Sequence, residues 1–162
     1  MGTRSEIQKS RVSQARGRLS NDPSNGSHLK GDLAQLVTKL QAMELEVSEE
    51  RGEFELFGLV LRAASEDRWD IVVSARWFSQ SREDELRYLS DKLTKALSPD
   101  ELLKISRIVP MWNRDDFVQE MQKLIQVQHG LQELEDSEVS SIDVKRALII
   151  TSGRVGSGRL IH

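Results

Sequence analysis

Two apolar stretches decide the fold of this 162-residue chain: Phe54-Glu-Leu-Phe-Gly-Leu-Val-Leu61 and Trp69-Asp-Ile-Val-Val-Ser-Ala75. Both are rich in aliphatic and aromatic residues, and the polar turn Ser65-Glu-Asp-Arg68 joins them. A short polar turn between two such runs predicts an antiparallel β-hairpin. Neither run alternates polar with apolar residues, so we expect these strands to be covered on both faces of a sheet.

Helices are predicted on both sides of this hairpin in the sequence. Apolar residues at helical spacing predict one helix over residues 31–47, a second over 79–97, and a third, capped by Asn113, over 113–128. Between the second and third helices, Ser98-Pro-Asp-Glu101 combines a capping serine, a proline at the first helical position and a glutamate at the third. We expect this sequence to begin a short helix.

Two further strands follow from the remaining apolar segments. Ser106-Arg-Ile-Val109 predicts a short strand closed by Pro110, and residues 141–151 predict a long last strand. We expect the acidic segment Glu133–Glu138 to be a loop that leads into this last strand. The fold class is therefore α/β (α+β), with a single mixed four-stranded sheet, the element order α-β-β-α-β-α-β and helices packed on the sheet.

The topology of the sheet follows from the connections between the strands. The hairpin makes the first strand antiparallel to the second, and strand-helix-strand steps favour right-handed crossovers between parallel strands. We therefore expect the first strand to run antiparallel to the other three. If both crossovers advance in one direction, the second and third long helices cover the same face. The other face is then covered by the first helix or by a partner chain.

One domain, residues 29–151, is expected to hold the sheet and its helices. Residues 1–28 are rich in Ser, Arg, Gln, Asn and Gly without apolar periodicity, which predicts a disordered basic tail. Residues 152–162 contain Gly and Arg without a period and predict a flexible C-terminal tail. No apolar run approaches the roughly 20 residues of a membrane span, so we expect no membrane insertion.

The charge of the chain is unevenly distributed. The net charge is -3, but residues 1–30 carry six basic and two acidic side chains, which leaves -7 on the rest. An acidic body repels the phosphates of nucleic acids, so nucleic-acid binding is predicted only as an alternative, through the basic tails. The absence of cysteine excludes disulfides and cysteine-ligated zinc, and it fits a cytoplasmic location.

A metal site is the main catalytic alternative. Glu53, Glu55 and Asp70 would form a magnesium site if they gathered at one end of the hairpin, as in a magnesium-dependent nuclease or nucleotide-processing enzyme. The sequence lacks the Glu-x-Lys pair expected beside such a site. The competing interpretation places Glu53 and Glu55 in solvent at the strand entry and makes Asp70 a cap of the turn.

Other chemistry has less support in the sequence. His129 is the one plausible general base, and no orienting carboxylate is obvious near it, so a nucleophilic triad is not predicted. The glycine-rich segment Gly153-Arg-Val-Gly-Ser-Gly158 follows a strand but lacks a Walker lysine. We therefore expect no cofactor.

Tryptophan and arginine residues near the strand ends form the candidate binding site. They are Arg62, Trp69, Arg76, Trp77 and Trp112. Parallel strands place functional loops at their carboxyl ends, and Trp and Arg are enriched in binding hot spots. The competing interpretation is that the tryptophans cap the core and that Arg76 pairs with an acid on the second long helix.

These observations favour a non-catalytic protein-interaction or oligomerising module over an enzyme. The expected partner is another protein or a second copy of the chain in a homo-oligomer. This hypothesis rests on the sheet that needs cover on both faces, on the Trp and Arg residues at the strand ends, and on the weakness of every catalytic pattern.

Overall fold

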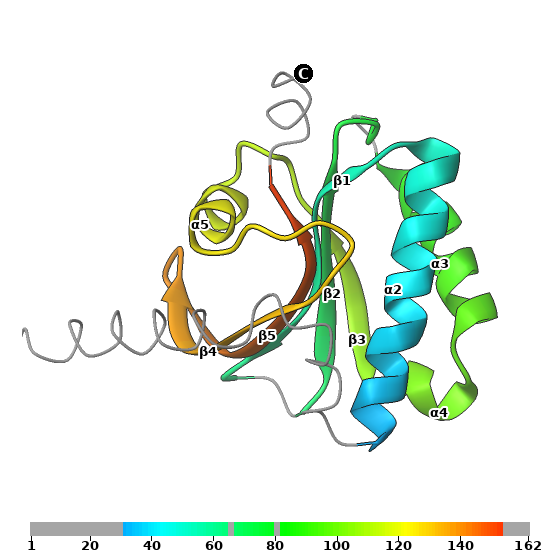
Figure 1. Ribbon diagram of the computed structural model, residues 1–162, viewed down its shortest axis with the longest axis horizontal. Helices are drawn as coiled ribbons and strands as arrows, with labels where there is room; N and C mark the ends of the chain where they lie inside the picture. The colour runs from blue at the N-terminus through cyan, green and yellow to red at the C-terminus, as the bar shows by residue number, and fades with distance from the viewer. Residues whose placement is uncertain (1–30, 65–66, 80–81, 154–162) are drawn as a thin grey trace, which may run out of the picture.

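A computed structural model describes residues 31–64, 67–79 and 82–153 of the chain. Its described part is a single sheet flanked by helices (Figure 1). The helices are α2 (Gly31–Arg51), α3 (Glu83–Ala96), α4 (Pro99–Leu102) and α5 (Asp116–Leu124). The strands are β1 (Phe54–Arg62), β2 (Trp69–Ala75), β3 (Ile105–Pro110), β4 (Gln132–Val139) and β5 (Ile142–Ser152).

The sheet is mixed, and its strand order is β3-β2-β1-β5-β4. β1 is antiparallel to both β2 and β5, β2 is parallel to β3, and β4 is antiparallel to β5. The predicted hairpin and the reversed direction of β1 are therefore present. The three most apolar strands, β2, β1 and β5, lie side by side at the centre, as their composition predicts.

The predicted number of strands is wrong, because the acidic segment Glu133–Glu138 belongs to β4 and is not a loop. Along β4, Leu134, Ser137 and Val139 are buried between exposed or half-buried acidic residues. One face of this edge strand packs on the core, so a partly acidic sequence still gains burial in a strand. The element order therefore gains a fifth strand before β5.

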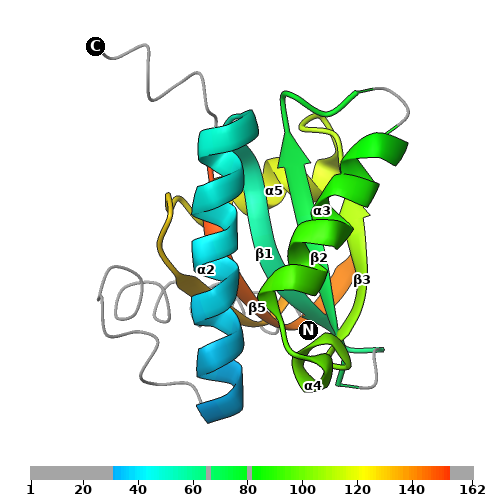
Figure 2. The same ribbon diagram turned by 90° about the vertical axis from the view of Figure 1, so that its right-hand side faces the viewer.

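The helices occupy both sides of the sheet (Figures 1 and 2). α2, α3 and α4 lie on one side, and α5 lies on the other. The second and third long helices would share a face only if both crossovers advanced in one direction, and the structure does not meet this condition. After β3 the chain returns across β2 and β1 to the opposite edge of the sheet, so α5 packs on the other face. Both faces are thus covered by helices of the same chain.

Two hydrophobic clusters fill the space between the layers. The cluster on the side of α2 and α3 includes Phe57 and Leu148, and the cluster on the side of α5 includes Met121 and Ile149. At Gly58 the strands β1 and β5 come so close that an added Cβ would lie 2.6 Å from the Ile149 Cδ1 atom. The centre of the sheet therefore accepts only glycine at this position without a shift of β5.

The helix boundaries differ from the sequence-based ones mainly at α5. This helix spans Asp116–Leu124, and its N-cap is Asp115 rather than Asn113. The predicted capping box is confirmed, because the Ser98 hydroxyl accepts from the Glu101 N–H and the Glu101 carboxylate accepts from the Ser98 N–H. Among the described helices, none is both long and apolar enough to span a bilayer. The predicted tails, residues 1–28 and most of 152–162, lie outside the described residues.

Candidate functional site

Trp112 lies just beyond the carboxyl end of β3, with two arginine side chains against its ring. The Arg82 guanidinium carbon lies 4.8 Å from the ring centroid, and that of Arg114 lies 5.2 Å from it. Both distances fall within the range of cation–π contacts. We call these three residues the Trp112 platform. Trp112 and Arg82 are half-buried, whereas Arg114 is exposed.

Backbone and side-chain hydrogen bonds hold the platform at the end of the sheet. The Met111 N–H donates to the Val73 carbonyl (2.8 Å), which extends the pairing of β3 with β2. The next N–H, that of Trp112, donates to the Asp115 carboxylate (3.1 Å). Arg82 reaches the same place from the start of α3 and donates from Nη1 to the Pro110 carbonyl (3.0 Å). The platform is therefore anchored by β3, α3 and the start of α5.

The platform offers positive charge and a flat apolar surface together. Stacking on an aromatic ring restrains a guanidinium and leaves its N–H groups free to bind carboxylate or phosphate oxygens. Within the described ranges, no carboxylate forms an ion pair with Arg82 or Arg114. Such a surface suits a ligand that presents acidic groups beside an apolar portion.

Arg76 and Trp77 follow β2, but their environments differ. Arg76 is exposed, and its Nε atom lies 3.8 Å from the carboxylate of the buried Glu55 in β1. Trp77 packs edge-on against Phe78, and its Nε1–H donates to the Gly52 carbonyl (2.9 Å). Trp77 therefore caps the core, as the competing interpretation had it, whereas Arg76 pairs with β1 rather than with the second long helix.

Trp69 and Arg62 lie at the other end of the β1–β2 hairpin from Arg76 and Trp77. Trp69 starts β2 and is buried in the cluster on the side of α2 and α3. Arg62 ends β1 and forms an ion pair with Asp70. The structure therefore divides the five predicted binding residues between two ends of the sheet. Of these five, Trp112 alone belongs to the platform.

The three carboxylates of the magnesium alternative do not converge. Asp70 pairs with Val60 in the register of the hairpin, whereas Phe54, between Glu53 and Glu55, pairs with Ala75. These positions are five residues apart in β2 and six in β1, which corresponds to about 17–20 Å along a strand. Within the described ranges, no three histidine, cysteine, aspartate or glutamate side chains gather closely enough to hold a metal ion. Asp70 does not cap a turn either, because two arginines bind its carboxylate.

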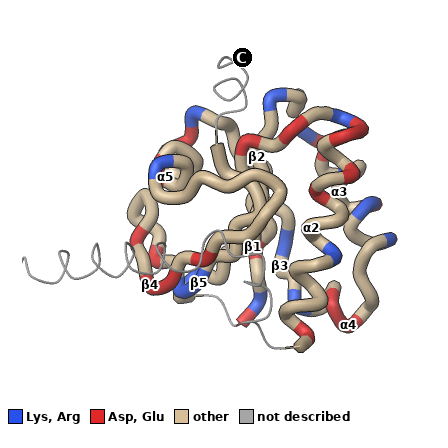
Figure 3. The backbone as a smooth tube through the Cα atoms, viewed as in Figure 1, with Lys and Arg blue, Asp and Glu red and all other residues tan. Residues whose placement is uncertain are grey.

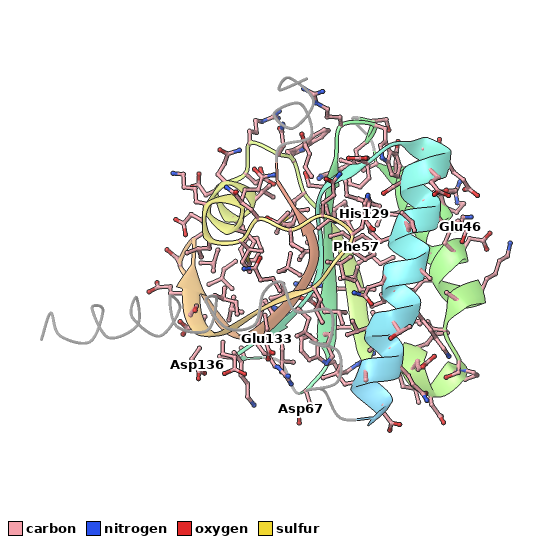
Figure 4. The ribbon with its side chains drawn as sticks, in the orientation of Figure 1. Glu46, Phe57, Asp67, His129, Glu133 and Asp136 are labelled. Atoms are coloured by element: carbon pink, nitrogen blue, oxygen red, sulfur yellow. The ribbon has the colours of Figure 1, made fainter. Side chains whose placement is uncertain are left out.

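The buried Glu44 and the partly exposed His129 form a pair that the sequence did not reveal. The Glu44 side chain is fully buried and lies 2.8 Å from the Nδ1 atom of His129. Its second oxygen accepts a hydrogen bond from the Thr151 hydroxyl (2.8 Å). Figure 4 places His129 between the sheet and α2. The orienting carboxylate that seemed absent therefore exists, 85 residues away in the chain.

The geometry of this pair favours anchoring over nucleophilic catalysis. The Thr151 hydroxyl donates to the Glu44 carboxylate and accepts a hydrogen bond from the backbone N–H of His129. It is therefore not hydrogen-bonded to the imidazole ring, as a nucleophile would be. Gln41 of α2 also donates to the Gly130 carbonyl (2.8 Å). These contacts tie the segment before β4 to α2. One sequence signal was present, since Glu44 lies four residues after Leu40 on the apolar stripe of α2.

A groove of about 490 Å³ runs between α2 and α3, and its charged residues neutralise one another. Lys92 of α3 binds Glu46 (2.8 Å) and Glu50 (3.0 Å) of α2, and these contacts raise its pKa. Burial, together with the hydrogen bond that its hydroxyl donates to Glu50, raises the pKa of Tyr88 to about 12. Hydrogen bonds from Tyr88 and Lys92 lower the pKa of Glu50. The groove is therefore a helix–helix contact with satisfied charges.

Acidic residues dominate the β4 edge of the sheet, which is opposite the β3 edge. β4 carries Glu133, Glu135, Asp136 and Glu138, and Figure 3 shows acidic segments along it. Burial, followed by the nearby Glu133, raises the pKa of Glu135. The Trp112 platform thus lies on the β3 side of the sheet, away from the acidic β4 edge.

The chain matches no protein-family model, no curated protein and no solved structure. Its function is therefore argued from its own residues.

Proposed function

We propose that this protein is a non-catalytic interaction module that binds an acidic segment of another protein through the Trp112 platform. The observation that carries the proposal is the stacking of Arg82 and Arg114 on Trp112 without a carboxylate partner among the described residues. Arg and Trp are also the residue types most enriched in binding hot spots. A partner segment with carboxylates beside an aliphatic side chain would match both properties of this surface.

A second copy of the chain is a weaker candidate for the partner. The main argument for a homo-oligomer was a sheet face without cover, and α5 covers that face. A partner of different sequence is therefore the better expectation. The cytoplasmic location inferred from the missing cysteine remains a prediction, and cell fractionation tests it.

Binding of an acidic probe peptide tests the proposal directly. A short fluorescein-labelled oligoglutamate peptide is titrated with the full-length protein, and anisotropy is recorded at low and at physiological salt. Binding should be saturable and should weaken with salt, because exposed charges are screened. Trp112→Ala and Arg114→Ala should each lower the affinity about tenfold, a change of about 1.4 kcal/mol.

Arg87→Ala is the matched control for these variants. Arg87 is an exposed arginine of α3 that pairs with Asp84 and is not part of the platform, so its loss removes one positive charge without changing the platform. The proposal is wrong if the Arg87 variant loses as much affinity as the Arg114 variant, since binding would then follow net charge alone. It is also wrong if the wild-type protein shows no saturable binding.

A further inference from the structure

Arg62 of β1 and Arg107 of β3, the two strands that flank β2, converge on the buried Asp70 of β2. Asp70 lies near the start of β2 and pairs in register with Val60 of β1 and Arg107 of β3. Arg62, at the end of β1, reaches it from the other side. Figure 2 shows β1, β2 and β3 side by side. The arrangement therefore rests on three adjacent strands rather than on loops.

The contacts of Asp70 determine how both guanidinium groups are oriented. The carboxylate is 3% exposed, accepts from Arg62 Nε at 3.0 Å through Oδ2, and from Arg107 Nε at 3.3 Å through Oδ1. A buried carboxylate that bonds to both Nε atoms fixes the planes of the two guanidinium groups. The desolvation of Asp70 is offset only while both contacts persist, which favours this arrangement.

The outer ends of both arginines remain available for a ligand. An arginine has five N–H donors, and each of these two uses only its Nε–H in the contacts above. Within the described ranges neither side chain forms any other hydrogen bond or ion pair. The Arg62 side chain is 37% exposed and that of Arg107 is 56% exposed. Two positive charges and one negative charge leave a net charge of +1 at this place.

We propose that Arg62 and Arg107 form a binding site for a phosphate-type oxyanion, with Asp70 as the positioning residue. Two planar forks that approach from the strands on either side of β2 can each donate to different oxygens of one tetrahedral group. A tetrahedral phosphate has enough acceptor oxygens to bind both forks at once, and the net positive charge at this place favours an anion. The site is independent of the Trp112 platform, because the two share no residue and Asp70 lies near the start of β2, whereas the platform follows the carboxyl end of the parallel strand β3.

The described groups around Arg62 and Arg107 are compatible with an anion at this place. Arg68 donates from Nη2 to the Ile105 carbonyl (2.9 Å) beside the site and adds positive charge. Among the described residues, Asp67 precedes β2 and Asp143 lies near the start of β5, and both are exposed. Neither of them forms an ion pair with Arg62 or Arg107. No described carboxylate other than Asp70 therefore occupies the two arginines.

Calorimetric titration with inorganic phosphate tests the site. The full-length protein is titrated with phosphate, phenyl phosphate and acetate at matched ionic strength and neutral pH. We expect saturable binding of the two phosphates and at least tenfold weaker binding of acetate. Tighter binding of phenyl phosphate than of inorganic phosphate would identify a phosphate ester as the natural ligand class, and equal binding would identify the free anion. Absence of saturable phosphate binding at millimolar concentrations overturns the proposal.

Two substitutions separate an oriented site from a merely positive surface. Arg107→Lys keeps the charge but removes the fork, so the affinity for phosphate should fall about tenfold. Asp70→Asn raises the net charge by one but releases the guanidinium groups, so an oriented site binds more weakly. Tighter binding by the Asp70→Asn variant would show that net charge alone attracts the anion and would overturn the role of Asp70.

Folding and specificity controls accompany these variants. Circular dichroism and thermal unfolding confirm that each variant is folded, and Arg107→Lys remains informative if Asp70→Asn is not. Arg87→Ala serves as the control, since it removes an exposed arginine that belongs to neither site and should leave phosphate binding unchanged. Arg107→Lys should weaken phosphate binding and leave binding of the acidic peptide unchanged. Failure of one proposal is therefore distinguishable from failure of the other.

Discussion

At the scale of single residues, Glu44 shows how one buried charge connects distant parts of the chain. Its carboxylate has no exposure, and its partners are His129 at 2.8 Å, the Thr151 hydroxyl at 2.8 Å and the Ser48 hydroxyl at 3.4 Å. A buried carboxylate is tolerated only when such partners replace its water. Because the partners come from the segment before β4 and from β5, Glu44 fixes α2 against both.

We expect His129→Ala to lower the free energy of unfolding by about 1–3 kcal/mol, because it leaves a buried carboxylate with one partner fewer. Urea denaturation measures this change. Gln126→Ala, on an exposed neighbour in the same segment, should cost less than about 0.5 kcal/mol.

The double variant tests the mechanism. Adding Glu44→Gln to His129→Ala removes the stranded charge, so the double variant should be more stable than the sum of the two single effects predicts. Strictly additive effects would show that His129 contributes through packing and not through Glu44.

At the scale of elements, the β4–β5 hairpin turns on two residues that rarely adopt its backbone conformation. Val139 pairs with Ile142, and the turn residues Ser140 and Ser141 have φ values of 53° and 68°. A two-residue hairpin with both φ values positive prefers Asn-Gly. A serine carries a steric cost in this left-handed region that glycine does not. The hairpin is therefore held by its strands and not by its turn.

We expect Ser141→Gly to raise the free energy of unfolding by about 0.5–1 kcal/mol, because relief of the left-handed strain exceeds the entropy that glycine adds to the unfolded chain. Thermal and urea unfolding measure the gain. Ser141→Ala keeps a Cβ at the same φ and should give no gain. Equal stabilisation by alanine would refute the explanation from backbone strain.

The short helix α4 depends on a carboxylate whose ionisation stabilises the fold. The hydrogen bond from the Ser98 N–H, followed by that from Lys39, holds the pKa of Glu101 below its usual value. A carboxyl group with a lowered folded pKa contributes stability above its unfolded pKa. This contribution is lost as the pH falls through the folded pKa.

We expect Glu101→Gln to destabilise the protein at pH 7 and to have a progressively smaller effect as the pH falls below about 4, because the stabilisation is lost as the pH falls through the lowered folded pKa of Glu101. Urea denaturation from pH 7 to pH 3 measures the difference between the two proteins. A difference that stays constant over this range would contradict the assigned role of the Glu101 charge.

At the scale of the whole molecule, both edges of the sheet carry features that oppose strand addition. In β3, the carbonyls of Ile105 and Pro110 accept from Arg68 and Arg82, and Pro110 has no N–H to offer. In β4, the acidic side chains repel a second copy, and Asp136 has a φ of 46°. Such devices are how folded proteins avoid pairing edge to edge.

We expect the full-length protein to sediment as a monomer at high micromolar concentration, since both sheet faces are covered and both edges are obstructed. Sedimentation equilibrium at physiological salt measures the mass. A concentration-dependent dimer would restore the homo-oligomer that the sequence suggested. Its dependence on Arg68→Ala would then show whether the β3 edge takes part.

The sequence correctly predicted the features that a local pattern of residues determines. Unbroken apolar runs identified β1, β2 and the apolar part of β5 as central strands, and the cap at Ser98 correctly placed α4. It failed for β4, a polar segment that forms a strand because one of its faces is buried and its acidic residues alternate with buried ones. It also left open which face of the sheet α5 covers, because no local pattern indicates the direction in which the chain crosses the sheet.

The candidate sites divide in the same way. The sequence singled out Trp112, Arg62 and Asp70 as chemically notable residues from their types and from their positions at strand ends. Only the tertiary structure decided that Arg82 and Arg114 join Trp112, and that Arg107 joins Arg62 on Asp70. Residue type and strand position are properties of the local sequence. Partners tens of residues apart are set by strand register and by the packing of whole elements, which no local pattern contains.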